Sequence, residues 1–195
     1  GRTTLNGEGL QHEDGHSHLL AGAIPNCKAY DPTFGFEVAV ILQHGMKQML
    51  EDQVDEYYYL TLMNENYPHP DMPEGAAEGI LKGMYLLKDA GKAKKGELRV
   101  QLLGSGTILR EAIAAAELLD KDFGVSADIW SCPSFTELRR DGFEAERYNR
   151  FHPEGEQKKA YVTSCLEGRQ GPAIAATDYV RAFADQIRAF VPMKY

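Results

Sequence analysis

Apolar residues along the chain follow two patterns, a recurrence every three to four residues and short continuous runs. The first pattern puts an apolar face on a helix, and the second is typical of a strand buried within a sheet. Helices are therefore predicted over residues 34–50, 74–82, 108–119, 134–148 and 178–190. Strands are predicted over residues 26–30, 56–63, 84–88, 98–103, 125–131, 160–166 and 173–176. This alternation predicts an α/β fold, in which helices cover the faces of a parallel sheet.

Polar and small residues mark where several of these elements begin and end. Ser134 is a good helix N-cap with a glutamate three residues later, as in a capping box, and Thr177 is expected to cap the last helix. The first 25 residues are glycine-rich and loop-like, and residues 90–97 form a turn or linker. The run 56–63 is apolar throughout, so we expect it to be buried in a sheet and not at an exposed edge.

Composition and charge exclude several classes of protein. The chain has 195 residues, 43% of them hydrophobic, and a formal net charge of −8. A generic nucleic-acid binder would instead carry a basic face, and no apolar run approaches the roughly 20 residues of a membrane span. Cys27, Cys132 and Cys165 are far apart, which argues against a structural zinc site or a disulfide scaffold and fits a reducing compartment. Both ends of the sequence look truncated, since a long loop precedes the first strand and residues 193–195 resemble the start of another strand. We therefore expect a piece of a longer protein.

Titratable side chains are concentrated in residues 7–18 (GEGLQHEDGHSH), which hold three imidazoles and three carboxylates. Imidazole is the side chain best matched to proton transfer near neutral pH. The density of these groups favours an active-site loop that serves a cofactor held elsewhere. A metal site built on His12, His16 and His18 is a second interpretation, although Gly15 breaks the helix that the four-residue spacing would need. An ordered polar loop without chemistry is the third.

Two other segments follow predicted strands, where sheet proteins often place function. The turn Gly104-Ser105-Gly106 opens a helix and could bind an anion, but it lacks the GxGxxG and GxxxxGKS patterns. Close packing of the helix on the strand is therefore the favoured interpretation. Residues 64–67 (NENY) fit a functional loop and a simple loop cap equally well.

At residues 9–18 (GLQHEDGHSH), followed by Ile24-Pro25-Asn26, the chain resembles the transketolase-type signature Gly-Leu-Gly-Glu-Asp-Gly-Pro-Thr-His followed by Ile-Pro-Asn. The longer string GRTTLNGEGLQHEDGHSH is more specific. With YDPTFGFEVAVI, YYYLTLMNENY, MPEGA, LLGSGTILREA and SFTELRRDG, it resembles the family of homodimeric pyruvate dehydrogenase (acetyl-transferring) components of bacterial pyruvate dehydrogenase complexes. The resemblance covers essentially the whole chain.

This resemblance implies a fold and a function. Residues 1–70 would be the end of a middle, pyrimidine-binding-type parallel-sheet domain with its active-site loop, 71–97 a linker, and 98–195 a truncated transketolase C-terminal-like domain. The family uses thiamine diphosphate and Mg²⁺. It decarboxylates pyruvate and reductively acetylates the lipoyl group of the dihydrolipoyl acetyltransferase component. It acts as a homodimer in the bacterial cytoplasm, so no nucleic-acid or membrane partner is expected.

The resemblance also assigns site residues. His12 and Glu8 match positions that line the active centre near the reacting end of the cofactor, and His18 matches the histidine that ends the transketolase signature. That signature has a proline where this chain has His16. The diphosphate–magnesium motif, Gly-Asp-Gly followed by an asparagine, and the cofactor-activating glutamate belong to parts of the family's polypeptide that this chain lacks. We therefore assign no cofactor-binding or metal residue, and expect the isolated chain to be inactive.

Three alternatives stay open. The chain could belong to a related thiamine diphosphate enzyme with another substrate, such as a transketolase-like enzyme. It could be a non-catalytic structural or dimerisation module, because C-terminal transketolase domains contribute to subunit contacts in that family. An independent metalloprotein built on the three histidines is the last.

Overall fold

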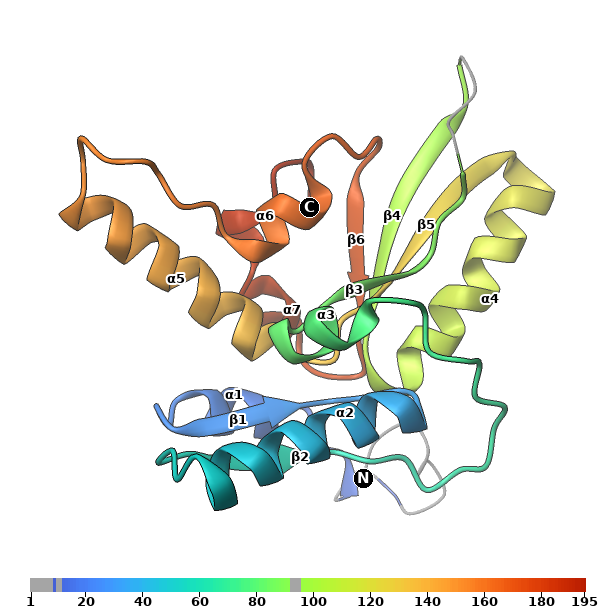
Figure 1. Ribbon diagram of the computed structural model, residues 1–195. Helices are drawn as coiled ribbons and strands as arrows, with labels where there is room; N and C mark the ends of the chain where they lie inside the picture. The colour runs from blue at the N-terminus through green and yellow to red at the C-terminus, as the bar shows by residue number, and fades with distance from the viewer. Residues whose placement is uncertain (1–8, 10–11, 92–95) are drawn as a thin grey trace.

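The computed structural model describes residues 9, 12–91 and 96–195, which form two sheets with helices around them (Figure 1). The first sheet is a parallel pair, β1 (Cys27–Tyr30) and β2 (Tyr57–Leu60). The second has four strands in the order β3, β5, β4, β6, in which β4 runs parallel to β5 and β6, and β3 is antiparallel to β5. Their bounds are Tyr85–Lys88 for β3, Leu98–Gly104 for β4, Val125–Ser131 for β5 and Ala173–Ala176 for β6.

Helices pack on both sides of the four-stranded sheet, with α4 on one side and α5, α6 and α7 on the other (Figure 1). The α-helices are α1 (Ser17–Gly22), α2 (Gly35–Met46), α3 (Ala76–Lys82), α4 (Gly106–Phe123), α5 (Phe135–Phe151), α6 (Tyr161–Leu166) and α7 (Arg181–Asp185). A π-helical turn, η3 (Lys47–Glu51), continues α2, and a 3-10 turn, η4 (Arg188–Phe190), follows α7. In the part of the chain that the structure describes, no helix is long and apolar enough to cross a membrane.

The predicted strands at 26–30, 84–88, 98–103, 125–131 and 173–176 are confirmed, as are the helices at 34–50, 74–82, 108–119 and 134–148, within a few residues at their ends. The start of α5 shows how a local signal fixed one boundary. The Glu137 N–H donates to the Ser134 hydroxyl oxygen at 3.0 Å, so Ser134 is the N-cap. The other half of the capping box does not form, because the Glu137 carboxylate binds Lys28 and Arg140 instead.

The strand predicted at 160–166 is wrong, because this segment forms the helix α6. Val162 and Leu166 are both fully buried, and their four-residue separation puts them on one helical face. The Asp141 carboxylate also accepts a hydrogen bond from the Tyr161 N–H at the first residue of the helix. An apolar run this short does not distinguish strand from helix by its pattern.

The ends of the chain differ from the prediction as well. The first 25 residues contain a helix, α1, and the predicted helix 178–190 is reduced to α7 and η4. Thr177 accepts from the Tyr179 N–H at 3.2 Å and closes a turn before the helix instead of capping it. Residues 193–195 form no strand, although the Lys194 carbonyl accepts from the Ala173 N–H at the start of β6.

The expected burial of segment 56–63 is also wrong. Its strand β2 is shorter than predicted and, among the residues described, pairs with β1 alone. Tyr57 is accordingly 43% exposed. Further along, β3 lies within residues 71–97, the segment expected to be a linker, and pairs with β5. The domain boundaries themselves stay a prediction.

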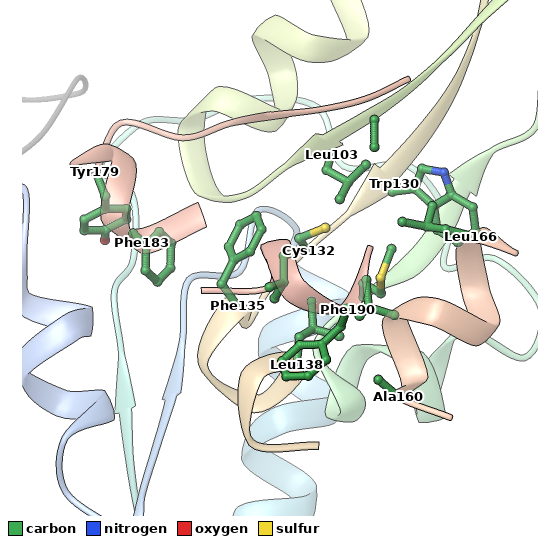
Figure 2. Close-up of a cluster of buried hydrophobic side chains, with 14 residues drawn as sticks. Leu103, Trp130, Cys132, Phe135, Leu138, Ala160, Leu166, Tyr179, Phe183 and Phe190 are labelled. Atoms are coloured by element: carbon green, nitrogen blue, oxygen red, sulfur yellow. The ribbon is translucent and has the colours of Figure 1, made fainter. Parts of the chain in front are cut away.

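The main hydrophobic core lies between the four-stranded sheet and helices α5, α6 and α7 (Figure 2). Leu103 and Trp130 come from the sheet, Phe135 and Leu138 from α5, and Phe183 from α7. The apolar stripe predicted for the last helix is buried as expected, even though the helix is short, because its residues face this core. The core therefore fixes the position of α7 against the sheet.

Candidate active site

The carboxyl ends of parallel strands from both sheets meet at one buried cluster, here called the seam and centred on Asp31. Asp31 follows β1 and is completely buried. Its carboxylate accepts hydrogen bonds from the hydroxyls of Thr61, after β2, at 2.6 Å and Ser105, after β4, at 2.9 Å. The Asp31 N–H donates to the carbonyl of Pro133, after β5, at 2.7 Å, and its carbonyl accepts from the Gly106 N–H. Ligand sites of open α/β sheets lie at such strand ends.

His18 is part of the seam. Its side chain is 1% exposed, and its Nε2 lies 2.8 Å from the Thr61 hydroxyl oxygen. Aromatic rings of Tyr59, Tyr179 and Phe183 surround the imidazole, with ring centroids 5.2, 5.0 and 5.3 Å away. The Tyr179 hydroxyl also donates to the Thr61 oxygen at 3.2 Å. His18 is therefore held inside the protein by polar contacts at one edge and by rings around its faces.

Glu37 is a second buried carboxylate beside the seam, on the first turn of α2. It accepts hydrogen bonds from the backbone N–H groups of Thr33 and Phe34, at 2.5 and 2.9 Å. It also accepts from the hydroxyls of Tyr85, on β3, at 2.7 Å and Ser131, on β5, at 2.5 Å. Burial raises the pKa of Glu37 above its ordinary value, although these hydrogen bonds oppose that shift. Neutral donors from three elements thus converge on one carboxyl group.

The turn Gly104-Ser105-Gly106 is packed tightly on both sides. A Cβ atom at Gly104 would lie 2.8 Å from the Leu109 Cα, and one at Gly106 would lie 2.5 Å from an Asp31 carboxylate oxygen. Gly106 also has a φ of +50°, which favours glycine. The geometry therefore agrees with close helix–strand packing, the interpretation favoured from the sequence, and Asp31 occupies the space beside the turn.

The loop that carries the predicted site residues is anchored where it enters α1. The Asp14 carboxylate accepts from the backbone N–H groups of His16 at 3.1 Å and Ser17 at 3.0 Å, so Asp14 holds the backbone where α1 begins. The Gly15 carbonyl accepts from the Val180 N–H at 2.9 Å, which ties the loop to the segment between β6 and α7. Together these contacts fix the backbone of the loop at the start of α1 and beside the segment that follows β6.

The predicted site residues lie in different environments. His18 is buried in the seam, His12 is exposed on the loop before α1, and Glu8 lies outside the described residues. His16 is exposed and precedes α1, so it does not share a helix with His12. Within the described ranges, no group of three His, Cys, Asp or Glu side chains is placed to hold a metal ion.

Sequence reasoning did not identify Asp31, Thr61 or Glu37 as candidates. Asp31 directly follows the expected strand 26–30, and the carboxyl ends of parallel strands converge, so that rule was the available signal for Asp31. Thr61 lies inside the expected strand 56–63 and follows β2 only because the observed strand ends at Leu60. Glu37 gave no comparable signal, because a glutamate in the first turn of a helix is common for capping reasons alone.

Comparisons with known proteins agree with this architecture. Residues 1–70 match the pyruvate dehydrogenase E1 component middle domain, and residues 83–193 match the transketolase-like TK C-terminal domain. The chain is 62% identical over 194 residues to the pyruvate dehydrogenase E1 component of Pseudomonas aeruginosa. It is 60% identical over 195 residues to that of Cupriavidus necator. Each alignment covers 100% of this chain and 22% of the relative, so the chain spans about a fifth of their length.

A solved structure of transketolase from Campylobacter jejuni has the same fold over most of this chain. Its TM-score is 0.62 over 96% of this chain and 24% of the transketolase chain, at 19% identity. A likeness at this identity concerns the fold alone. The predicted fold class, a parallel-sheet domain end followed by a transketolase C-terminal-like α/β domain, is confirmed.

Proposed function

Since this chain belongs to the transketolase-like C-terminal domain family and matches the pyruvate dehydrogenase E1 middle domain before it, we propose that it is part of a pyruvate dehydrogenase (acetyl-transferring). The complete enzyme decarboxylates pyruvate and passes the acetyl group to the lipoyl group of a dihydrolipoyl acetyltransferase, and it acts as a homodimer in the bacterial cytoplasm. The observation that carries this proposal is an identity of 62% sustained over the whole chain, through both domain matches.

Thiamine diphosphate would supply the nucleophilic carbon that attacks the keto carbon of pyruvate. Within the described residues, no three His, Cys, Asp or Glu side chains are grouped to hold a metal ion. The sequence also contains no Gly-Asp-Gly motif. We therefore assign the binding of the cofactor to the rest of the longer protein. The contribution of this chain is the loop of residues 9–18 and the seam that anchors it.

His12 is the residue of this chain best suited to proton transfer with the substrate. Its imidazole side chain is exposed, and its backbone is tied to Gly9 by an N–H to carbonyl hydrogen bond of 3.0 Å. We assign it to donate a proton to the oxygen of the keto group as negative charge develops there, or to clamp that oxygen by a hydrogen bond. Glu8 would tune the water and charge around His12, an assignment that rests on the family resemblance.

The substitution His12→Ala in the complete enzyme tests this assignment. Turnover with pyruvate should fall by about 10²–10⁴-fold, the usual range for a general acid or base. The decarboxylation half-reaction and the overall reaction should be measured separately. His16→Ala is the matched control, because the His16 side chain is exposed and makes no capping hydrogen bond to α1. Unchanged rates for His12→Ala in both assays would remove His12 from the mechanism.

The competing functions are a transketolase-like enzyme with another substrate and a non-catalytic dimerisation module. Offering the complete enzyme pyruvate and a ketose phosphate in parallel separates the first from the proposed function. The module is the outcome if neither substrate turns over while the complete protein remains dimeric by size-exclusion chromatography.

A further inference from the structure

We propose that Asp31 and Thr61 are positioning residues that hold His18 with a proton on Nε2, and that this fixes the start of α1 and the loop carrying His12. The proposal extends the proposed function. Its kinetic test rests on that function, because it measures turnover of pyruvate by the complete enzyme. Three side chains form one chain of hydrogen bonds, here called the relay: the Asp31 carboxylate, the Thr61 hydroxyl and the His18 imidazole. Each member comes from a different segment of the first 61 residues.

Counting protons assigns the direction of each hydrogen bond. A carboxylate only accepts, so the Thr61 hydroxyl donates its single proton to Asp31 across 2.6 Å. The Thr61 oxygen can then only accept from the imidazole, which lies 2.8 Å away. His18 must therefore carry its proton on Nε2. The Tyr179 hydroxyl lies 3.2 Å from the same Thr61 oxygen and 3.4 Å from Asp31 Oδ1, and it donates its single proton to these two acceptors, so it adds a donor to the cluster and takes none from His18.

Asp31 can direct this relay because it is itself immobilised. Its other carboxylate oxygen accepts from the Ser105 hydroxyl at 2.9 Å, and its backbone is bonded to Pro133 and Gly106. The side chain is completely buried, so water does not compete for these bonds. The orientation of His18 is thus set by the carboxyl ends of strands in both sheets.

The rings around His18 restrict its rotation. Tyr179 and Phe183 lie close together at one end of the main core, as Figure 2 shows, and each has its ring centroid within 5.3 Å of the imidazole. Tyr59, from β2, packs on it as well, at 5.2 Å. A flip of the imidazole would exchange Nε2 for a carbon atom opposite Thr61 and leave that oxygen without its donor. The relay therefore selects one ring orientation.

Fixing His18 also fixes the exit of the active-site loop. His18 is the second residue of α1 and follows Ser17, whose N–H donates to the Asp14 carboxylate. The Gly15 carbonyl is held by Val180, which precedes α7 and its buried Phe183. His12 lies only a few residues before these anchors. A loose His18 would let the loop shift, and small displacements of reacting groups are costly, about 10²-fold in rate for about 1 Å.

The test compares Thr61→Val with Thr61→Ser in the complete enzyme. Valine keeps the shape of threonine but removes the hydroxyl, whereas serine keeps the hydroxyl. The expected result is a fall in kcat with pyruvate of about 10²-fold for valine, with little change in KM, and near wild-type turnover for serine. Equal kcat values for the two variants would overturn the proposal, because the hydroxyl would then have no role.

A second measurement reads the proton directly. In protein labelled with ¹⁵N-histidine, the Nε2 signal of His18, assigned by its loss in His18→Gln, should be that of a protonated nitrogen in wild type and in Thr61→Ser. A bare Nε2 in wild type would overturn the relay even if the enzyme is active. Conversely, a wild-type enzyme that leaves pyruvate unchanged but shows a protonated Nε2 refutes the proposed function and retains the relay. If Thr61→Val does not fold, the wild-type and serine spectra still decide.

Discussion

Two buried carboxylates of this protein, Glu37 and Asp128, are compensated in opposite ways. Both side chains are completely buried. Asp128, in the middle of β5, accepts from Nε of Arg99 at 2.9 Å and from Nη2 of the same guanidinium, a bidentate pair. Gln101 adds a third donor at 2.8 Å. We call Asp128, Arg99 and their partners the arginine cluster. Glu37 instead receives neutral hydroxyl and backbone donors.

The difference appears in the acid–base behaviour of the two groups. Burial by itself raises the pKa of Asp128, but the hydrogen bonds and charge of Arg99, with help from Ala90 and Gln101, lower it below its usual value. Burial dominates at Glu37, and its pKa is raised. The arginine cluster lies away from the seam, whereas Glu37 lies beside it. Groups with a raised pKa are candidates for functional sites, so Glu37 and Asp128 are worth testing apart.

The largest effect is expected from breaking the arginine cluster with Arg99→Ala. Asp128 would then stay buried with its main charge partner removed, which costs about 3–5 kcal/mol of unfolding free energy. Urea unfolding measures this loss. Arg181→Ala is the control, because Arg181 pairs with Asp185 on the surface and its side chain is 82% exposed; exposed pairs contribute about 0–1 kcal/mol. If both variants lost a similar amount of unfolding free energy, burial would not determine how much an ion pair stabilises this protein.

A smaller loss is expected at Glu37, and it should depend on the replacement. Glu37→Ala removes the acceptor shared by Thr33, Phe34, Tyr85 and Ser131. Because the two hydroxyls can rotate to other partners and water can enter the space that the side chain leaves, we expect a net loss of about 1–3 kcal/mol, the cost of one buried group left unsatisfied. Glu37→Gln should cost less. Its amide oxygen can accept from the backbone N–H groups, while its NH₂ donates to the two hydroxyls, which can rotate to accept. Equal unfolding midpoints for alanine and glutamine would contradict this account.

The same contrast shows how far the sequence predicts the structure. Elements whose apolar period is long and unambiguous, such as α4 and β5, lie where the pattern placed them. Residues 160–166 were assigned to a strand because a run of seven residues has no distinguishable period, and only the packing of Val162 and Leu166 makes it a helix. The predictions failed where tertiary contacts decide between two local structures.

The site divides in the same manner. The loop of residues 7–18 is visible in the sequence because its titratable groups are contiguous. The seam and the neighbouring Glu37 site are not, because the residues that meet there are far apart in the sequence: Asp31 meets Ser105 across 74 residues, and Glu37 meets Ser131 across 94. A lone aspartate before a proline predicts only a turn. The significance of Asp31 appears only when the strand ends that surround it are placed together.

The smallest expected effect is the change in unfolding free energy with pH. It also distinguishes the two carboxylates most sharply, because it has opposite signs for them. Because the pKa of Glu37 is raised in the folded state, its contribution to stability is complete below its unfolded pKa, near 4.5, and is lost as pH rises through the folded pKa. Asp128 has the opposite sign: its contribution is present above its unfolded pKa and is lost as pH falls through its lowered folded pKa.

Unfolding free energies of wild type, Glu37→Gln and Asp128→Asn between about pH 2 and about pH 8 test these signs, because the window of Asp128 lies below its ordinary pKa. The unfolding free energy of Glu37→Gln should increase relative to that of wild type as pH rises, because the variant no longer has to keep a buried charge. The unfolding free energy of Asp128→Asn should lie furthest below that of wild type at neutral pH, and this difference should become smaller in acid. Should both differences stay constant with pH, neither carboxylate would change its pKa on folding. If they change with the same sign, neutral donors and arginine would compensate a buried carboxylate equally, and the distinction between the seam and the arginine cluster would be one of position alone.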